Sequence, residues 1–160
     1  MTAKLFDIDK GYKDFIGELQ NLKGKTVKAG VLGSKATNIH KDSDGLTNAE
    51  VAAYNEFGTE NIPERSFIRS AYDSIADTLI QEVIVLIKRQ AKPEYIHNHI
   101  GLRLQDAIQD KIREGGEPYT PNAKSTIKAK GFDRPLIDSS EILQVVTYVV
   151  EEAKNYEIKT

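Results

Sequence analysis

The chain of 160 residues contains no cysteine and only three histidines. Without a thiolate, it cannot form a disulfide framework, a zinc finger, an iron–sulfur cluster or a catalytic cysteine site. A serine nucleophile would need a histidine partner, and the sequence has no Gly-x-Ser-x-Gly turn to present one. We therefore expect no catalytic residue, no metal site, no cofactor and no enzymatic activity.

Long apolar segments and an excess of positive charge are also lacking. The densest apolar run, Leu79 to Ile87, is interrupted by polar residues and falls short of the roughly 20 residues that cross a bilayer. Asp7 interrupts what would be the apolar core of a signal peptide. The 22 Lys and Arg against 24 Asp and Glu give a net charge of −2, unlike a dedicated DNA-binding domain. We expect no export signal, no membrane contact and at most transient contact with DNA.

What the sequence does contain is the composition of a folded domain, with 39% hydrophobic and 29% charged residues. At this length the chain should form one domain, residues 1–160, and hide about 70% of the surface that its unfolded form exposes. Such a core needs neither a disulfide nor a metal.

The first half of the chain alternates between periodic segments and a polar loop. Helical spacing of apolar residues predicts a helix over Asp9–Leu22, and β-rich alternation predicts a strand over Thr26–Leu32. Residues 33–46 have no periodicity and predict a mobile loop. Thr47 and Glu50 form a capping-box pattern, which predicts a helix over Asn48–Phe57.

Two long helices should follow. The spacing predicts one over Ser66–Lys92, ended by Pro93, and a second over Glu94–Glu114, closed by two glycines. The first is apolar around most of its middle, so it is either the centre of the core or has a face left for another subunit. The candidate interface residues on it are Ile80, Ile84 and Ile87.

The last segment predicts a short basic stretch and a strand. Residues 122–134 carry the one local excess of positive charge, and Gln144–Val150 is dense in β-branched residues. Asn155–Lys159 could pair with that strand as a hairpin. The predicted fold class is α+β, a small antiparallel sheet packed with an N-terminal helix and two long central helices. The candidate DNA-facing residues are Lys124, Lys128, Lys130 and Arg134.

Three apparent site motifs do not fit the chemistry they suggest. Gly24–Thr26 looks like the end of a phosphate loop, but a helix precedes it and a strand follows, which is the reverse order. His40–Val51 lacks the first and last ligands of a calcium loop. His97 and His99 would face opposite sides of a helix, and we expect both at the surface.

Two stretches carry more specific information. The first is Asn48–Thr59 (NAEVAAYNEFGT), followed by Ile62–Arg69 (IPERSFIR). The second is Glu117–Pro121 (EPYTP), followed by Thr126–Gly131 (TIKAKG) and Arg134–Leu143 (RPLIDSSEIL). Together they resemble the tail-completion or head–tail joining (neck) family of tailed phages, which includes the virion morphogenesis proteins of Mu-like phages. In that family a helix ending in Glu-Phe-Gly-Thr leads through a proline turn to Arg-Pro-Phe-Leu, and a late loop reads Pro-Leu-Ile-Asp-Thr-Gly.

The resemblance spans roughly Val27 to Val150 in order and spacing. Ser66 stands where proline is usual, Ser139 and Ser140 replace Thr-Gly, and Tyr119 occupies a position that is often tryptophan. The positions that match the family motif are Glu56, Phe57, Gly58, Pro63, Arg65, Phe67, Pro135, Leu136 and Asp138.

Physical roles can be assigned to several of these positions. Gly58 should take a left-handed conformation at the end of the short helix, Phe57 should anchor that helix, and Pro63 should fix the turn into the long one. These residues could build the fold alone or contact another subunit. Glu56 and Arg65 could pair within the subunit or across to the next.

The resemblance implies a non-enzymatic virion protein that forms a homo-oligomeric ring at the neck or the head-proximal end of a tail. Its partners would be further copies of itself and other neck and tail proteins, and it would be assembled in the host cytoplasm. A ring needs two different patches on each subunit. The alternative hypothesis is a nucleic-acid-associated adaptor that binds DNA phosphates through the basic residues of 122–134.

Overall fold

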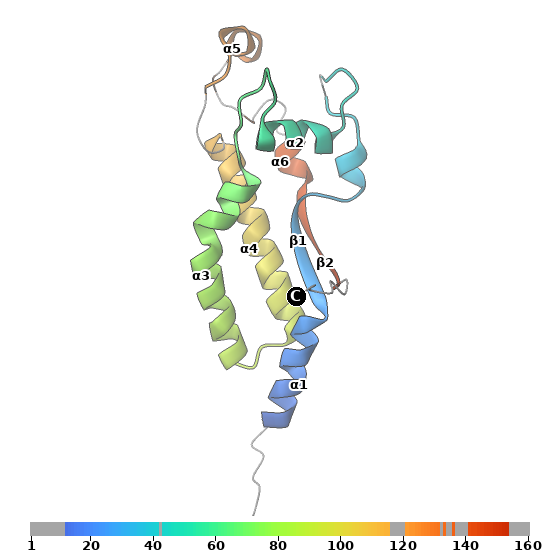
Figure 1. Cartoon of the computed structure of the whole chain (residues 1–160), viewed down its shortest axis with the longest axis vertical. Helices are drawn as coiled ribbons and strands as arrows, with labels where there is room; N and C mark the ends of the chain where they lie inside the picture. Colours follow the sequence, from blue (N-terminus) through green and yellow to red (C-terminus); the bar gives the residue numbers. More distant parts are fainter. Residues whose placement is uncertain are drawn as a thin grey trace, which may run out of the picture.

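Two antiparallel helices, α3 (Ile68–Lys88) and α4 (Pro93–Glu114), run along the length of the molecule (Figure 1). The computed structural model describes residues 12–41, 43–115, 121–131, 133, 136 and 141–153. α4 follows its predicted bounds closely. α3 ends earlier than predicted, because Gln90 adopts a left-handed conformation with φ of 54°. The amides of Gln90 and Ala91 then bond to the carbonyls of Ile87 and Leu86, which is a Schellman ending. Pro93 therefore begins α4 and does not terminate α3.

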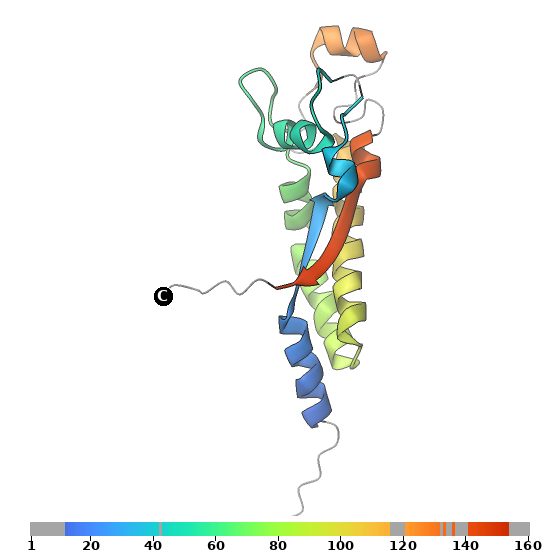
Figure 2. The same ribbon diagram turned by 90° about the vertical axis from the view of Figure 1, so that its right-hand side faces the viewer.

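A two-stranded antiparallel sheet lies along α4 (Figure 2). Its strands are β1 (Lys25–Val31) and β2 (Val146–Glu152), paired in register from Lys25 opposite Glu152 to Val31 opposite Val146. β2 begins two residues later than predicted, because residues 141–145 form a short helix before it. The proposed hairpin partner of β2, residues 155–159, lies outside the described residues.

Close contact between the sheet and α4 depends on Gly101. A Cβ at this position would lie 2.1 Å from Cδ2 of Tyr148 on β2, so only a residue without a side chain lets the ring pack there. The Tyr148 hydroxyl donates a hydrogen bond to Oδ1 of Asn98 on α4, at 3.3 Å.

The remaining helices cover the two ends of this body. α1 (Tyr12–Lys23) packs on α4 and β1 and extends from the lower end in Figure 1. The 3-10 helix η1 (Ser34–Thr37), α2 (Asn48–Phe57), α5 (Lys124–Lys130) and α6 (Glu141–Val145) lie at the upper end. The predicted start of the first helix, Asp9, lies outside the described residues. The architecture confirms the predicted α+β class.

The hydrophobic core is concentrated at the upper end, where α2, α6 and β2 meet the start of α3 and the end of α4. Its centre is Phe67, which is fully buried, together with buried aliphatic residues from all these elements. These are Ala52, Ala71, Ile108, Ile112, Ile142 and Val146. The lower half of α3, by contrast, leaves several apolar side chains uncovered by described residues.

Candidate interaction surface

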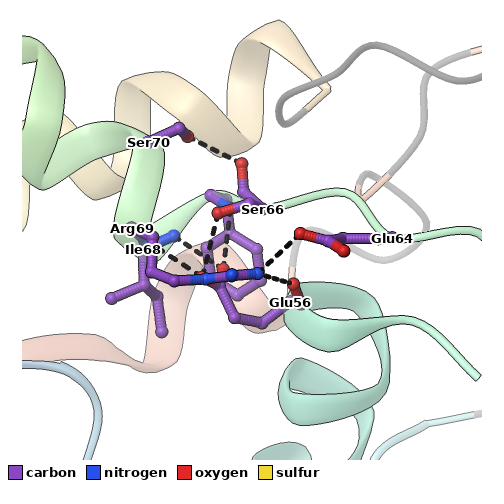
Figure 3. Close-up of polar contacts among 7 residues, drawn as sticks. Glu56, Glu64, Ser66, Ile68, Arg69 and Ser70 are labelled. Carbon is purple, nitrogen blue, oxygen red and sulfur yellow. Dashed lines mark hydrogen bonds and ion pairs between the residues drawn. The ribbon is translucent and has the colours of Figure 1, made fainter.

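The motif stretch forms the junction between α2 and α3, and Glu56 is its central residue. The Glu56 carboxylate lies at the N-terminus of α3 and is 3% exposed (Figure 3). Its Oε2 accepts the backbone amides of Phe67 and Ile68 at 2.7 and 2.8 Å, and its Oε1 accepts that of Arg69 at 3.1 Å. The Ser66 hydroxyl donates to the same carboxylate at 3.0 Å. One side chain from α2 thus satisfies the free amides that begin α3.

The charge at this junction is also balanced. Burial raises the pKa of Glu56, but the amides of Ile68, Arg69 and Phe67 and the Arg69 side chain outweigh it, so the pKa is lower than its usual value. Arg69 donates from Nε to Glu56 at 3.0 Å and from Nη2 to Glu64 at 2.7 Å. The carboxylate is therefore held charged inside the fold.

Glu56 does not pair with Arg65 within the subunit, which was one of the two alternatives for these residues. Arg65 is 6% exposed, its Nη2 donates to the carbonyl of Pro121 at 3.2 Å, and its backbone amide donates to the carbonyl of Asn55 at 2.8 Å. Arg69, one turn further along, takes the place that Arg65 was expected to fill. The two charges that the sequence suggested as an exposed pair are both buried and serve different contacts.

Three other motif residues, Phe67, Gly58 and Phe57, can be compared with the roles expected from the sequence. Phe67 is a core residue, which favours the fold-building alternative for this position. Gly58 ends α2 and has a positive φ of 71°, as expected, but its ψ of 170° is extended and not left-handed helical. A Cβ on Gly58 would lie 2.9 Å from the backbone nitrogen of Glu64, so the turn that contains Pro63 closes directly against it. Phe57 does not anchor α2 in the core, because 66% of it is exposed and its ring lies beneath the Arg69 guanidinium, 5.1 Å away.

The late motif is described only in part. Leu136 packs against the core and has a φ of 64°. Pro135 and Asp138 lie outside the described residues.

An apolar groove of about 530 Å³ runs between α3, α4 and the junction of α1 with β1. Its α3 wall includes four residues that we call the α3 stripe: Tyr72, Ile80, Val83 and Ile84. Tyr72 is 56% exposed and Ile80 is 53% exposed. Of the predicted interface residues, Ile80 and Ile84 lie on this stripe. Ile87 is half-buried and lines a small gap with Phe15 and Leu19 of α1, so it serves the fold of its own subunit.

The α4 wall of the groove contains His97, which was predicted to be a surface residue. It is 5% exposed, because the end of α1 covers this part of α4, and its Nε2 lies 3.3 Å from the carbonyl oxygen of Leu22. His99 faces elsewhere, with Nε2 2.8 Å from Oε2 of Glu82, and Tyr95 stacks on it. Glu82 also accepts from Arg103, so this network joins α3 to α4.

Residues 33–46 contain more structure than a loop. They include η1, and the His40 amide donates to the carbonyl of Leu46 at 2.8 Å. Nδ1 of His40 lies 2.6 Å from Oδ1 of Asn48, a residue 1% exposed at the start of α2. The Lys41 amide donates to Glu141 on α6 at 2.9 Å. Mobility of this segment stays a prediction, but its described residues are tied to two helices.

The basic residues of 122–134 lie mainly on α5, at the upper tip of the molecule (Figure 1). Lys124 and Lys128 are exposed and one helical turn apart. Lys130 ends the helix, and Arg134 lies outside the described residues.

The described residues contain no candidate metal centre and no candidate membrane-spanning helix. Among the described residues no group of three His, Asp or Glu side chains could hold a metal ion. No helix in that part of the chain is long and apolar enough to span a bilayer.

The resemblance to the phage neck family is supported by the sequence motifs alone, because comparisons with known proteins add nothing to it. A scan against family models, a search of curated proteins and a search of solved structures each found no match.

The surface residue that sequence reasoning missed is Tyr72. Its signal was its spacing of eight residues from Ile80, which places both on the same side of a helix.

Proposed function

We propose that this chain is a structural protein of a tailed-phage virion that acts in tail completion or head–tail joining by assembling into a ring at the neck. The observation that carries the proposal is the α3 stripe, an exposed apolar surface on one of the two long helices of the molecule. Apolar surface of this kind, rimmed by polar residues, marks a site of protein association. The order and spacing of the phage-like motifs support the specific kind of assembly.

In this function the junction at Glu56 and the α3 stripe have separate roles. The junction fixes how α2 meets α3, while the stripe contacts a neighbouring protein, either another copy or another neck or tail protein. A closed ring joins two different patches of each subunit, so the stripe would be one of the two. The work of the protein is then done by contacts and not by a reaction.

The test is to delete the gene from the phage that encodes the chain and to complement it with variants. Deletion should leave filled heads and separate tails in electron micrographs, and the wild-type chain should restore joined particles. Ile80→Asp should fail to restore them although the variant folds. Val85→Asp is the matched control, because Val85 is 44% exposed on the same helix but does not line the groove. Joined particles in the deletion strain without complementation would contradict the proposal.

The second candidate is the DNA-binding adaptor, favoured by the exposed Lys124 and Lys128 on α5. It predicts DNA binding that weakens steeply as salt rises, since phosphate contacts release counterions. No binding to duplex DNA at low salt would exclude it.

A further inference from the structure

The α3 stripe has a charged edge whose sign changes along the helix. At 3.6 residues per turn, Asp73, Asp77 and Lys88 fall with Ile80 and Ile84 inside an arc of about 80°. The two aspartates stand on the N-terminal side of Ile80, and Lys88 stands at the C-terminal end of α3, roughly 16 Å beyond Asp77.

These three charges are exposed and have no ion-pair partner within the part of the chain that the structure describes. The charge of Glu82, the other acidic residue in this stretch, is directed to His99 and Arg103 on α4. The edge of the stripe is therefore negative in its first half and positive at its end. A surface with this pattern is complementary to itself when one copy is reversed.

We propose that the α3 stripe binds the α3 stripe of a second copy of this chain, with the two helices antiparallel around a two-fold axis near residue 82. Such an axis keeps each charged edge beside the same edge of the partner helix. When Ile80 lies opposite Ile84 of the other copy, Lys88 of one copy falls level with the stretch between Asp73 and Asp77 of the other. Each α3 then covers the groove of its partner.

The antiparallel arrangement follows from the charges. A parallel two-fold pair would place the charged edges of the two copies on opposite sides of the seam, so Lys88 of one copy would have no aspartate of the other beside it. Charged residues at the edge of an apolar helix seam set partner orientation in this way. The apolar stripe supplies most of the affinity, and the edge selects the direction.

This pairing would also control assembly. A two-fold contact closes on itself and cannot extend into a ring. The dimer would therefore be the form of the protein before assembly, in which the α3 stripe is covered and cannot make its ring contact. This role rests on the proposed function, whereas the dimer itself does not.

The test uses charge exchange in the full chain, measured by sedimentation velocity. Asp73→Lys with Asp77→Lys makes the edge wholly positive, and Lys88→Asp makes it wholly negative. Each variant alone should dimerise at least about tenfold more weakly than the wild type, because the symmetry repeats every substitution. An equimolar mixture of the two should recover dimers, because both edges of the mixed pair are again opposite in sign. Asp106→Lys, at an exposed site on α4 outside the stripe, is the control and should dimerise like the wild type.

Three results would overturn the inference. The first is a wild-type chain that stays monomeric at high concentration. The second is Ile80→Asp that dimerises like the wild type, which would place the contact elsewhere. The third is a mixture no better than either variant, which would exclude the antiparallel pair. In each case complementation of the deletion strain still tests the proposed function, so the two can fail separately.

Discussion

The first turn of α3 and the middle of the same helix use their side chains in opposite ways. At the first turn, a carboxylate, a guanidinium and a hydroxyl are all engaged within the subunit, around Glu56. From the second turn to the middle of the helix, Tyr72 and Ile80 are more than half exposed and the adjacent aspartates have no ion-pair partner among the described residues. One helix therefore has an end built for the fold and a face that the fold of its own subunit does not need.

This difference distinguishes residues that stabilise the fold from residues that form an interaction surface. The residues of the motif stretches lie mainly at the junction, where the described ones make contacts within their own subunit. The stripe contains none of the motif positions. A recognisable motif and a working surface are thus different regions of this protein, and substitutions can tell them apart.

The largest expected effect is that of Glu56→Gln. The neutral side chain keeps the size but places an amide against backbone donors in a buried site, so we expect the free energy of unfolding to fall by about 3 kcal/mol. Chemical denaturation followed by circular dichroism measures the change. Glu64→Gln is the matched control, since Glu64 also pairs with Arg69 but is 48% exposed, and it should lose no more than about 0.5 kcal/mol. Equal losses in the two variants would show that the buried carboxylate of Glu56 stabilises the junction no more than an exposed charge does.

A smaller effect is expected for Gly58→Ala. The added Cβ would contact the backbone of Glu64, and the alanine would have to adopt a positive φ. The free energy of unfolding should therefore fall by about 2 kcal/mol. Gly45→Ala separates the two causes, because Gly45 has a φ of 86° but no atom within 4 Å of the position that a Cβ would take. We expect about 1 kcal/mol there. If both variants lose the same amount, the turn does not press on Gly58.

Acid should destabilise the junction through the Glu56 carboxylate. The pKa of Glu56 is lower in the folded protein than its usual value, so its charged form stabilises the fold above the unfolded pKa, near 4.5, and that stability is lost as the pH falls through the folded pKa. Stability measured from about pH 6 downward should therefore fall more steeply for the wild type than for Glu56→Gln. Parallel profiles would mean that the carboxylate is not held charged.

The sequence predicted the elements whose signals are local. The capping box of Thr47 and Glu50 is present as expected, with both of its hydrogen bonds. The two helices α3 and α4 followed from apolar periodicity, with Pro93 and two glycines as boundary signals. The end of α3 could not be read in the same way, because the left-handed Gln90 is not a residue type that marks such a position.

Contacts between distant residues were the part that the sequence left open. Nothing near Glu56 in the sequence shows that its carboxylate reaches amides 11 to 13 residues later, and the neighbouring Arg65 offered a simpler partner. The burial of His97 likewise depends on where α1 packs, which periodicity does not specify. Exposure of Ile80 was predictable, because a helix that is apolar around most of its circumference cannot bury every side against α4, the helix that packs along it.

The smallest effect on the isolated subunit is expected for Ile80→Ser. Because Ile80 is 53% exposed, its loss should change the stability of the monomer by less than about 1 kcal/mol. The wild type should nevertheless melt at a higher temperature as its concentration rises, since dimerisation stabilises the folded state by mass action. Ile80→Ser should melt at the same temperature at every concentration, whereas Glu56→Gln should lower the melting temperature but keep the concentration dependence. A stripe variant that lowers stability as much as Glu56→Gln at low concentration would place Ile80 in the fold of its own subunit and remove the distinction between the two regions.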